Sequence, residues 1–171
     1  MAAAVNQVRD ANRDTRGSAE RERKKTSVAR NKSARHDYHV LESYEAGVVL
    51  SGTEVKSLRE GKANIGDAFG IVRGGEVFLV NAHIAPYGSS GYVTHEPTRT
   101  RKLLLHRREI RRLIGAVERE GLTLIPLELY FSDGRAKVAI ALAKGKKLHD
   151  KRDDARRKDA EREIARAFRR R

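Results

Sequence analysis

Residues 122–143 read LTLIPLELYFSDGRAKVAIALA, and this stretch decides the fold. Two runs rich in apolar and β-branched residues, Leu122–Phe131 and Ala136–Ala143, flank the segment Ser132-Asp133-Gly134-Arg135. Asp-Gly between two such runs is a strong signal for a tight turn, so the stretch predicts an antiparallel hairpin. Pro126 cannot donate a hydrogen bond to a neighbouring strand, which predicts an edge position or a bulge there.

Two further segments, both earlier in the chain, also predict strands. Ala68–Arg73 and Glu76–Ala82 are rich in Phe, Ile and Val, and the Gly74-Gly75 pair between them suits a tight turn, so a second hairpin is expected. Residues 38–50 contain apolar and β-branched residues that are interrupted by an acidic bend around Glu45. This pattern predicts one long bent strand or a pair of strands.

Two helices are expected between these strands. A short one begins at Gly52 and Thr53, with Thr53 as the N-cap and Gly61 as the stop, and its apolar residues Val55 and Leu58 share one side. A stronger one ends at Gly121, because its apolar residues recur at the helical spacing i, i+3, i+4 and i+7: Ile110, Leu113, Ile114 and Val117. The opposite face of this second helix is rich in arginine.

These elements predict a mainly β protein of about six short antiparallel strands with short helices. A sheet of that size avoids exposed edges most easily by closing into a small barrel, and an oligonucleotide-binding-like Greek-key barrel fits best. A helix-backed open sheet has the same elements and remains the alternative. The chain of 171 residues has room for one such domain plus terminal arms.

The positive charge lies at the two ends of the chain. The net charge of +14 divides into +6 for residues 1–35, +1 for residues 36–143 and +7 for residues 144–171. Residues 6–32 are polar and lack hydrophobic periodicity, which predicts disorder. We therefore expect a disordered basic extension over 1–30, a barrel over 31–143 and a basic tail over 144–171. Flexible basic arms around a nearly neutral body favour a polyanionic partner, with nucleic acid as the first hypothesis.

Other classes of function find little support in the residues. The chain has no cysteine, and His36 and His39 would fall on opposite faces of a strand, so neither a metal nor another cofactor is expected. Gly145-Lys146-Lys147 lacks the upstream glycine of a phosphate-binding loop, and no catalytic triad is evident. We expect a binding protein rather than an enzyme. No apolar run approaches the roughly 20 residues that cross a bilayer, which predicts a cytoplasmic protein without a membrane partner.

A basic cluster lies in the body of the protein. The segment PTRTRKLLL, residues 97–105, is followed by the arginine face of the predicted second helix. Guanidinium groups donate forked hydrogen bonds to phosphate, so this cluster predicts a dock for an RNA backbone. The alternative is a solvated helix face balanced by nearby acidic residues. The cluster includes Arg99, Arg101, Lys102, Arg107, Arg108, Arg111 and Arg112, and the acidic residues are Glu109, Glu118 and Glu120.

Five separate motifs, in the same order from Asn31 to Arg152, resemble the SsrA-binding protein family. They are NKSARHDY at 31–38, YEAGV at 44–48, GTEVKSLR at 52–59, PTRTRKLLL at 97–105, and AKGKK at 143–147 followed by DKR at 150–152. The resemblance implies a small barrel that binds the tRNA-like domain of transfer-messenger RNA and delivers it to stalled bacterial ribosomes. It also implies contacts with small-subunit RNA at the A site and messenger channel, and with elongation factor Tu through the charged RNA complex.

The resemblance assigns Glu45, Leu105 and His106 to the RNA-binding surface. A carboxylate such as that of Glu45 can accept hydrogen bonds from exposed bases, although pairing with a neighbouring arginine is the alternative. Many relatives carry asparagine in place of His106. Thr53, Glu54, Val55 and Leu58 are expected to be architectural. The remaining predicted RNA-binding residues are Asn31, Lys32 and Arg35 on the exit of the arm, and Arg99, Arg101 and Lys102 before the helix.

For the ribosome, the resemblance places His36 near the decoding centre, and a surface histidine at the start of a strand is the alternative. The resemblance also makes Gly145 a flexible joint. Coupled folding predicts a tail that is disordered when free and helical on the ribosome. Its apolar stripe of Ala160, Ile164 and Phe168 would order last, with Phe168 replacing the tryptophan that relatives often have. The other predicted ribosome-contacting residues are Lys144, Lys146, Lys147, Asp150, Lys151 and Arg152. A merely solubilising tail is the alternative.

The remaining alternatives are a generic single-stranded RNA-binding protein, a ribosomal protein and, least supported, a hydrolase. A generic single-strand binder uses stacking aromatic side chains. This chain has only four Phe and five Tyr residues and no Trp, which favours recognition of RNA shape instead.

Overall fold

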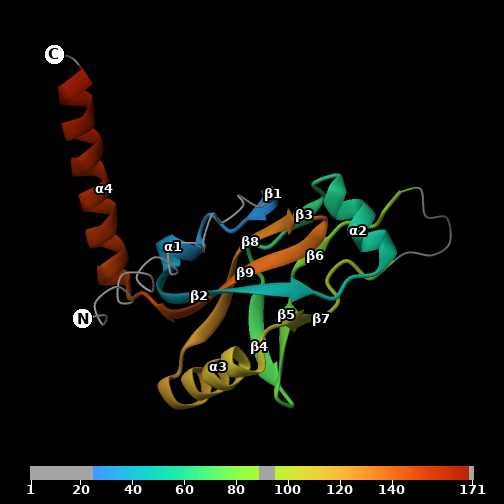
Figure 1. Ribbon diagram of the computed structural model, residues 1–171. Helices are drawn as coiled ribbons and strands as arrows, with labels where there is room; N and C mark the ends of the chain where they lie inside the picture. The colour runs from blue at the N-terminus through green and yellow to red at the C-terminus, as the bar shows by residue number, and fades with distance from the viewer. Residues whose placement is uncertain (1–24, 89–94, 170–171) are drawn as a thin grey trace, which may run out of the picture.

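The computed structural model describes residues 25–88 and 95–169 (Figure 1). The strands are β1 (Lys25–Arg30), β2 (Tyr38–Val48), β3 (Ala63–Asn64), β4 (Phe69–Arg73), β5 (Glu76–Val80), β6 (His83–Ile84), β7 (Arg101–Leu104), β8 (Thr123–Ser132) and β9 (Arg135–Gly145). The helices are α1 (Ala34–Asp37), α2 (Gly52–Arg59), α3 (Arg107–Glu120) and α4 (Leu148–Arg169).

Six strands close into an antiparallel ring. The order is β8, β4, β5, β7, β2 and β9, and β9 pairs again with β8. Strand β4 pairs with β8 near its start, at Leu124, whereas β1 pairs with its second half, Glu128 to Ser132. The ring confirms the predicted barrel of about six strands and excludes the open sheet, because every strand of the ring has neighbours on both sides.

The hairpin that decided the prediction forms as expected. Strands β8 and β9 pair from Thr123–Ala143 to Ser132–Arg135, and the turn between them places Asp133 and Gly134 at φ values of 50° and 76°. Both residues thus occupy the left-handed region that Asp and Gly tolerate best. The register shifts between Pro126 and Glu128, which confirms a bulge. The edge position is wrong, since β8 has partners on both sides.

One core fills the barrel, and helices cover it. Leu58 of α2 and Leu113 of α3 are buried in the same apolar cluster as the inward-facing residues of the strands. Figure 1 shows α2 and α3 on opposite sides of the sheet. Strands β4 and β8 approach closely at Gly70, where a Cβ atom would lie 2.6 Å from Cβ of Leu124. Only glycine fits there without displacing the backbone.

The N-cap of the short helix α2 lies two residues before the predicted cap. Ser51 is the N-cap, with its hydroxyl accepting from the N–H of Glu54, while the Glu54 carboxylate accepts from the N–H of Ser51 at 2.7 Å. Thr53 is therefore inside the helix, and the prediction of Thr53 as N-cap is wrong. This reciprocal pair is a capping box, which a Ser followed three residues later by Glu signals in the sequence. Gly61, with φ of 73°, follows the last turn.

The predicted disorder is wrong for residues 25–32, because Lys25–Arg30 form strand β1 on β8. Val28 and Ala29 pack against the barrel core. Two ion pairs tie the strand down, from Lys25 and Arg30 to Glu128 at 2.9 and 3.0 Å. The pairing energy comes from a strand about 100 residues away, so local composition does not reveal it. The rest of the predicted N-terminal disorder lies outside the described residues.

Acidification is expected to release β1 before the barrel unfolds. Burial opposes ionisation of Glu128, but hydrogen bonds from Ser27, Lys25 and Arg30 outweigh it and lower its pKa from 4.5 to about 2. Because the folded pKa lies below the unfolded value, Glu128 stabilises the docked strand above pH 4.5, and this stabilisation is lost as the pH falls towards 2. Hydrogen exchange of the β1 amides, corrected for intrinsic rates, should accelerate in this range.

The control is Glu128→Gln, which should weaken β1 at neutral pH and remove most of its acid dependence. Simultaneous loss of protection in β1 and in the β4–β5 hairpin would contradict a separate release of β1.

Candidate nucleic-acid interface

Helix α3 presents a concentrated group of exposed positive charges on the barrel. Its apolar face, with Leu113 and Ala116 buried, packs on the core, and this leaves the arginines on the opposite face in solvent. Arg112 forms an ion pair with Glu42 of β2. The hydroxyl of Tyr44 and the charge of Arg112 lower the pKa of Glu42, against a smaller effect of burial. The exposed arginines of this helix are Arg107, Arg108, Arg111, Arg112 and Arg119.

The first residues of α3 include two predicted RNA-binding positions. His106 is the exposed N-cap, and its backbone N–H donates to the Glu109 carboxylate at 2.8 Å. Its ring therefore projects at the start of the helix, beside the first two arginines. Leu105 is partly buried and packs against the core, so it supports the end of β7 as well as bordering the surface.

Glu45 lies on the outer face of β2, where Tyr130 and Lys137 contact its carboxylate. One oxygen accepts from the hydroxyl of Tyr130, and the other accepts from Nζ of Lys137. The described contacts of this carboxylate thus include a lysine and a tyrosine. Burial and the Glu45 carboxylate raise the pKa of Tyr130. Nζ of Lys25 lies over the ring of Tyr130, 3.8 Å from its centroid. These contacts fix the orientation of a carboxylate that is still about half exposed.

The prediction that Arg101 contacts RNA is wrong, because its side chain is completely buried. Its Nε donates to Oε1 of Glu54 at 2.9 Å, and its other nitrogens donate to backbone carbonyls that include that of Pro97. Glu54 is also completely buried and accepts from Nε of Arg99 at 2.8 Å. We call Glu54, Arg99 and Arg101 the buried ion cluster. It ties α2 to β7 and to the segment before it.

Arg99 and Lys102 keep part of their charge at the surface. The side chain of Arg99 is 32% exposed although it belongs to the buried ion cluster. Lys102 is partly exposed and pairs with Glu76 across the β5–β7 ladder. Both remain within reach of a partner, but their positions are set by protein carboxylates. The acidic neighbours that the sequence did not reveal are thus Glu54 and Glu76.

Asn31 is buried and organises the chain before α1, so its prediction as an RNA-contacting residue is also wrong. Its side-chain amide donates to the carbonyls of Ile65 and Gly66, and its side-chain oxygen accepts from the N–H of Ala34 at 3.0 Å. The predicted contact residues of this segment that are exposed are Lys32, Arg35 and His36. His36 lies in α1 rather than in a strand, and its Nδ1 is 3.0 Å from Asp37.

The start of the tail is fastened to α1. The Nζ of Lys146 donates to the Arg35 carbonyl at 2.9 Å and pairs with Asp154, and its side chain is only 8% exposed. Lys151 pairs with Asp37 at 2.8 Å. Hydrogen bonds from Lys151 and Lys146 lower the pKa of Asp37 and Asp154, respectively. We call these contacts the tail joint.

The joint refines the predictions for the basic motif at the start of the tail. Gly145 is the last residue of β9 and pairs with Tyr38, so the strand continues two residues beyond the predicted end of the barrel at residue 143. Asp150 accepts from the N–H of Lys147 at 3.1 Å and lies 3.8 Å from His39. The motif is therefore partly engaged by the barrel. The residues that stay exposed are Lys144, Lys147 and Arg152.

Beyond the joint, α4 projects away from the barrel (Figure 1). Its 22 residues form the helix that coupled folding predicts for the bound tail. Ala160, Ile164 and Phe168 recur on one side, and the side chains of Ile164 and Phe168 are 57% and 75% exposed. Ion pairs in this part are local, as between Arg157 and Asp154. Disorder of the tail in the absence of a partner stays a prediction.

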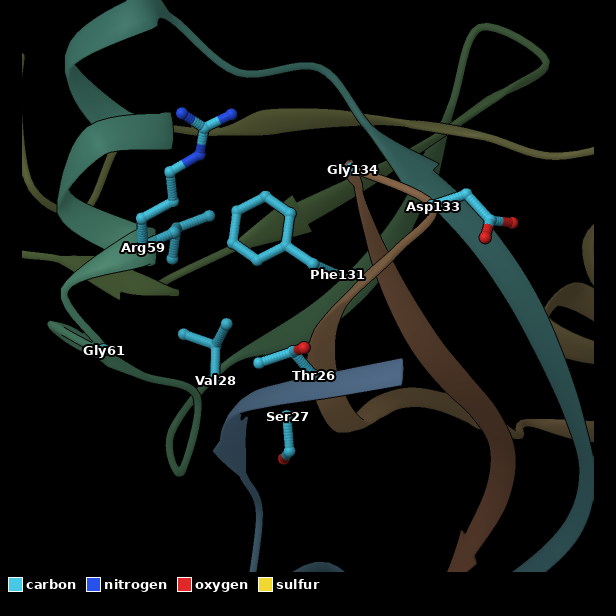
Figure 2. Close-up of a pocket in the computed structure, with 9 residues that line it drawn as sticks. Thr26, Ser27, Val28, Arg59, Gly61, Phe131, Asp133 and Gly134 are labelled. Carbon is cyan, nitrogen blue, oxygen red and sulfur yellow. The ribbon is translucent and has the colours of Figure 1, made fainter. Parts of the chain in front are cut away.

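A hollow lies between β1, α2 and the β8–β9 turn, with a volume of about 390 Å³ (Figure 2). Its wall is mainly apolar, from Val28, Leu58 and Phe131. Figure 2 shows the ring of Phe131 directed towards Arg59, while the Asp133 carboxylate points away from the ring. With one basic side chain on its wall, this hollow lacks the charge that the face of α3 offers to a polyanion.

Some classes of site are not found among residues 25–88 and 95–169. These residues contain no group of three or more His, Cys, Asp or Glu side chains arranged to hold a metal ion. None of the described helices combines the length and apolar composition needed to cross a membrane.

A closed β-barrel with an exposed arginine helix and a basic projecting tail defines an RNA-binding-type barrel protein of the oligonucleotide-binding-like class. The SmpB protein family matches residues 28–170. The chain belongs to this family. It is 60% identical over 149 residues to the SsrA-binding protein of Desulforudis audaxviator, covering 87% of this chain and 97% of that one. It is 61% identical over 141 residues to the SsrA-binding protein of Saccharopolyspora erythraea, covering 82% and 89%.

A solved structure agrees with this membership. The chain described as "tmRNA-SmpB: a journey to the center of the bacterial ribosome" aligns with a TM-score of 0.59 and 54% identity, and covers 70% of this chain and 84% of that chain.

Sequence reasoning missed the residues that organise the site through burial. Lys146 reads as one of many tail cations, yet its side chain is nearly buried in the tail joint. Glu54 was expected to be architectural, but the sequence did not predict that it would be the acid of a buried ion cluster. A weak signal existed for Glu54, because Ser51 precedes it at the capping-box spacing. No local signal distinguishes Lys146 from its neighbours.

Proposed function

We propose that this protein binds the tRNA-like domain of transfer-messenger RNA and delivers it to stalled bacterial ribosomes for tagging of the nascent chain and ribosome rescue. The observation that carries the proposal is membership of the SmpB family over residues 28–170, in relatives named for binding SsrA. The barrel supplies a fixed surface for a folded RNA, and the tail supplies a basic helix for a second polyanion. Its action is binding, in the cytoplasm, without catalysis.

RNA binding and ribosome binding are assigned to two separate surfaces. The arginine face of α3, with His106, Leu105, Glu45, Arg99 and Lys102, serves the RNA. The tail joint and α4, with Lys32, Arg35 and His36 beside them, serve small-subunit RNA at the A site and messenger channel. Elongation factor Tu joins through the charged RNA complex. Because Asn31 and Arg101 are buried, they act by holding α1 and β7 in place.

A direct binding experiment tests this function. The full-length protein is titrated with the tRNA-like domain of transfer-messenger RNA, with an ordinary tRNA and with an unstructured RNA over a salt series. We expect selective binding of the first RNA that persists as salt weakens the other two, because nonspecific phosphate contacts lose affinity steeply with salt. Equal affinities for the three RNAs at every salt concentration would contradict the proposal and favour a generic RNA-binding protein.

Glu45→Gln should weaken the RNA complex while the barrel remains folded. A neutral amide accepts weaker hydrogen bonds than a carboxylate, and charge-assisted hydrogen bonds contribute about 1.5 to 3 kcal/mol, so a loss of about tenfold or more in affinity is expected. Titration with the tRNA-like domain gives the affinity, and thermal unfolding gives the stability. Lys137→Gln is the matched control, because it removes a partner of Glu45 but keeps the carboxylate. An unchanged dissociation constant for Glu45→Gln would remove Glu45 from the interface.

A further inference from the structure

A groove runs between β2 and the outer part of α3, with a volume of about 410 Å³. Its floor includes Leu122 and Leu142, and its rim carries Arg111, Arg112 and Arg119. We call it the Gly115 groove, after the glycine in the middle of its helical wall. None of its residues belongs to the motifs that carry the family resemblance.

Gly115 has no structural reason to be glycine. It lies in the interior of α3, where glycine destabilises a helix relative to alanine. A Cβ atom built there would meet nothing within 4 Å, so neighbouring protein atoms do not require its absence. Its φ is also not positive, unlike that of Gly121 at the end of the helix. Glycine at such a position permits the close approach of another backbone.

The opposite wall of the groove carries an apolar side chain at a β-bulge. Val40 pairs with Ala143 and Glu42 with Leu142, so Leu41 is the extra residue of β2. A bulge turns a side chain out of the regular alternation of the strand and is common beside binding sites. Leu41 is 55% exposed and lines the groove. It offers an apolar contact to a ribose or a base.

The charge of the groove is suited to phosphate. Arg111 and Arg119 are exposed, and neither forms an ion pair with any residue in 25–88 or 95–169. Arg112 is held by Glu42, and Glu120 is the only other acid on the lining. Arg111 and Arg119 lie about 12 Å apart along the helix axis, with Gly115 midway. A backbone that crosses α3 at Gly115 would thus have a guanidinium on each side.

We propose that the Gly115 groove is a subsite for the sugar–phosphate backbone of RNA. The strand lies against the bare helix backbone at Gly115, Arg111 and Arg119 bind phosphates on either side, and Leu41 packs on a sugar or base. The assignment rests on the proposed function and names a part of the surface that serves it. An acidic protein segment is disfavoured, because the groove is small and guanidinium groups donate forked hydrogen bonds that suit phosphate oxygens.

The test compares Gly115→Ala with Gly52→Ala. Gly52 also lies in a helix with nothing within 4 Å of a Cβ position, but it is in α2, away from the groove. Gly115→Ala should raise the melting temperature by about 2 to 4 °C, because the helix is stabilised. It should also weaken binding of the tRNA-like domain by about tenfold. Opposite signs for stability and affinity are what a merely structural glycine would not produce.

A second pair of variants tests the charges. Arg111→Gln with Arg119→Gln should weaken binding and reduce the slope of log affinity against log salt by about 1.5, since each phosphate contact contributes about 0.7 to 0.9. Arg73→Gln with Arg135→Gln removes two exposed charges at hairpin turns and should change the slope little.

The outcomes separate the groove from the function. A wild-type protein without preference for the tRNA-like domain would overturn the proposed function itself. Selective binding by the wild type, together with unchanged affinity in Gly115→Ala and in the double arginine variant, would overturn the groove alone. Normal RNA affinity combined with a rescue defect in Gly115→Ala would also overturn it, and would assign the groove to a protein or ribosomal partner.

Discussion

Glu54→Gln is expected to lower the free energy of unfolding by about 3 to 5 kcal/mol, because it leaves the buried guanidinium of Arg101 without its counter-charge. Both side chains are completely buried, and Arg101 fills its remaining donors with backbone carbonyls rather than water. Chemical denaturation at neutral pH, read by circular dichroism, measures the change. A loss below about 1 kcal/mol would show that the buried ion cluster contributes little beyond packing.

The same cluster predicts a pH dependence. Burial opposes ionisation of Glu54, but hydrogen bonds from Arg99 and from the N–H of Ser51, with the charge of Arg101, outweigh it and lower its pKa to about 2. The folded pKa is thus below the ordinary value of 4.5. Glu54 therefore stabilises the fold fully above pH 4.5 and loses this contribution as the pH falls towards 2. The Gln variant should unfold with a flatter acid dependence.

Matched variants of the buried ion cluster separate the effect of its charges on stability from the effect of side-chain volume. Arg99→Gln should cost less than Glu54→Gln, because the Arg99 side chain is 32% exposed and water can replace part of its role. Glu54→Leu combined with Arg101→Leu should recover much of the stability lost by either change alone, since apolar pairs can replace buried ion pairs. Additive losses in the double variant would mean that the two side chains act independently.

The elements that the sequence predicts well depend on local signals. The β8–β9 hairpin follows from Asp133-Gly134 between two apolar runs, and α3 follows from its helical spacing and from Gly121 with φ of 62° at its end. Strand β1 depends instead on the paired strand β8, and its own sequence, KTSVAR, has only two apolar residues. Its strand structure arises from pairing with a strand that is distant in the sequence, so a short stretch of sequence does not predict it.

In the candidate site, too, tertiary contacts decide the position of single side chains that local sequence does not distinguish. Arg101 and Arg111 both read as members of one basic cluster, yet the first is completely buried and the second is exposed. The difference is set by Glu54, 47 residues before Arg101, which the fold brings to 2.9 Å. Family resemblance placed the RNA surface on β2 and at the start of α3. It did not distinguish side chains that contact a partner from those that hold the surface.

Removal of residues 157–171 is expected to leave binding of the tRNA-like domain within about twofold of the full-length protein while abolishing tagging on stalled ribosomes. The truncated chain keeps every contact of the tail joint, because Lys146, Lys151 and Asp154 all precede the cut. The part removed contains Ile164 and Phe168, whose exposed side chains lie outside both apolar clusters of the described residues. Its loss should not disturb the surface formed by α3 and β2. Electrophoretic shift gives the affinity, and incorporation of the tag into a stalled nascent chain gives the activity.

Two further variants decide what the tail contributes. If α4 acts only through its charge, Ile164→Ser with Phe168→Ser should tag normally, since every arginine and lysine remains. We expect a strong loss instead, because a helix that orders on a polyanionic surface needs its apolar stripe to pack against a partner. Lys151→Gln opens one contact of the joint without touching the stripe, and a smaller loss is expected because Lys146 still fastens the tail to α1. A truncation that destroyed RNA selectivity would reverse the division of labour between the barrel and the tail.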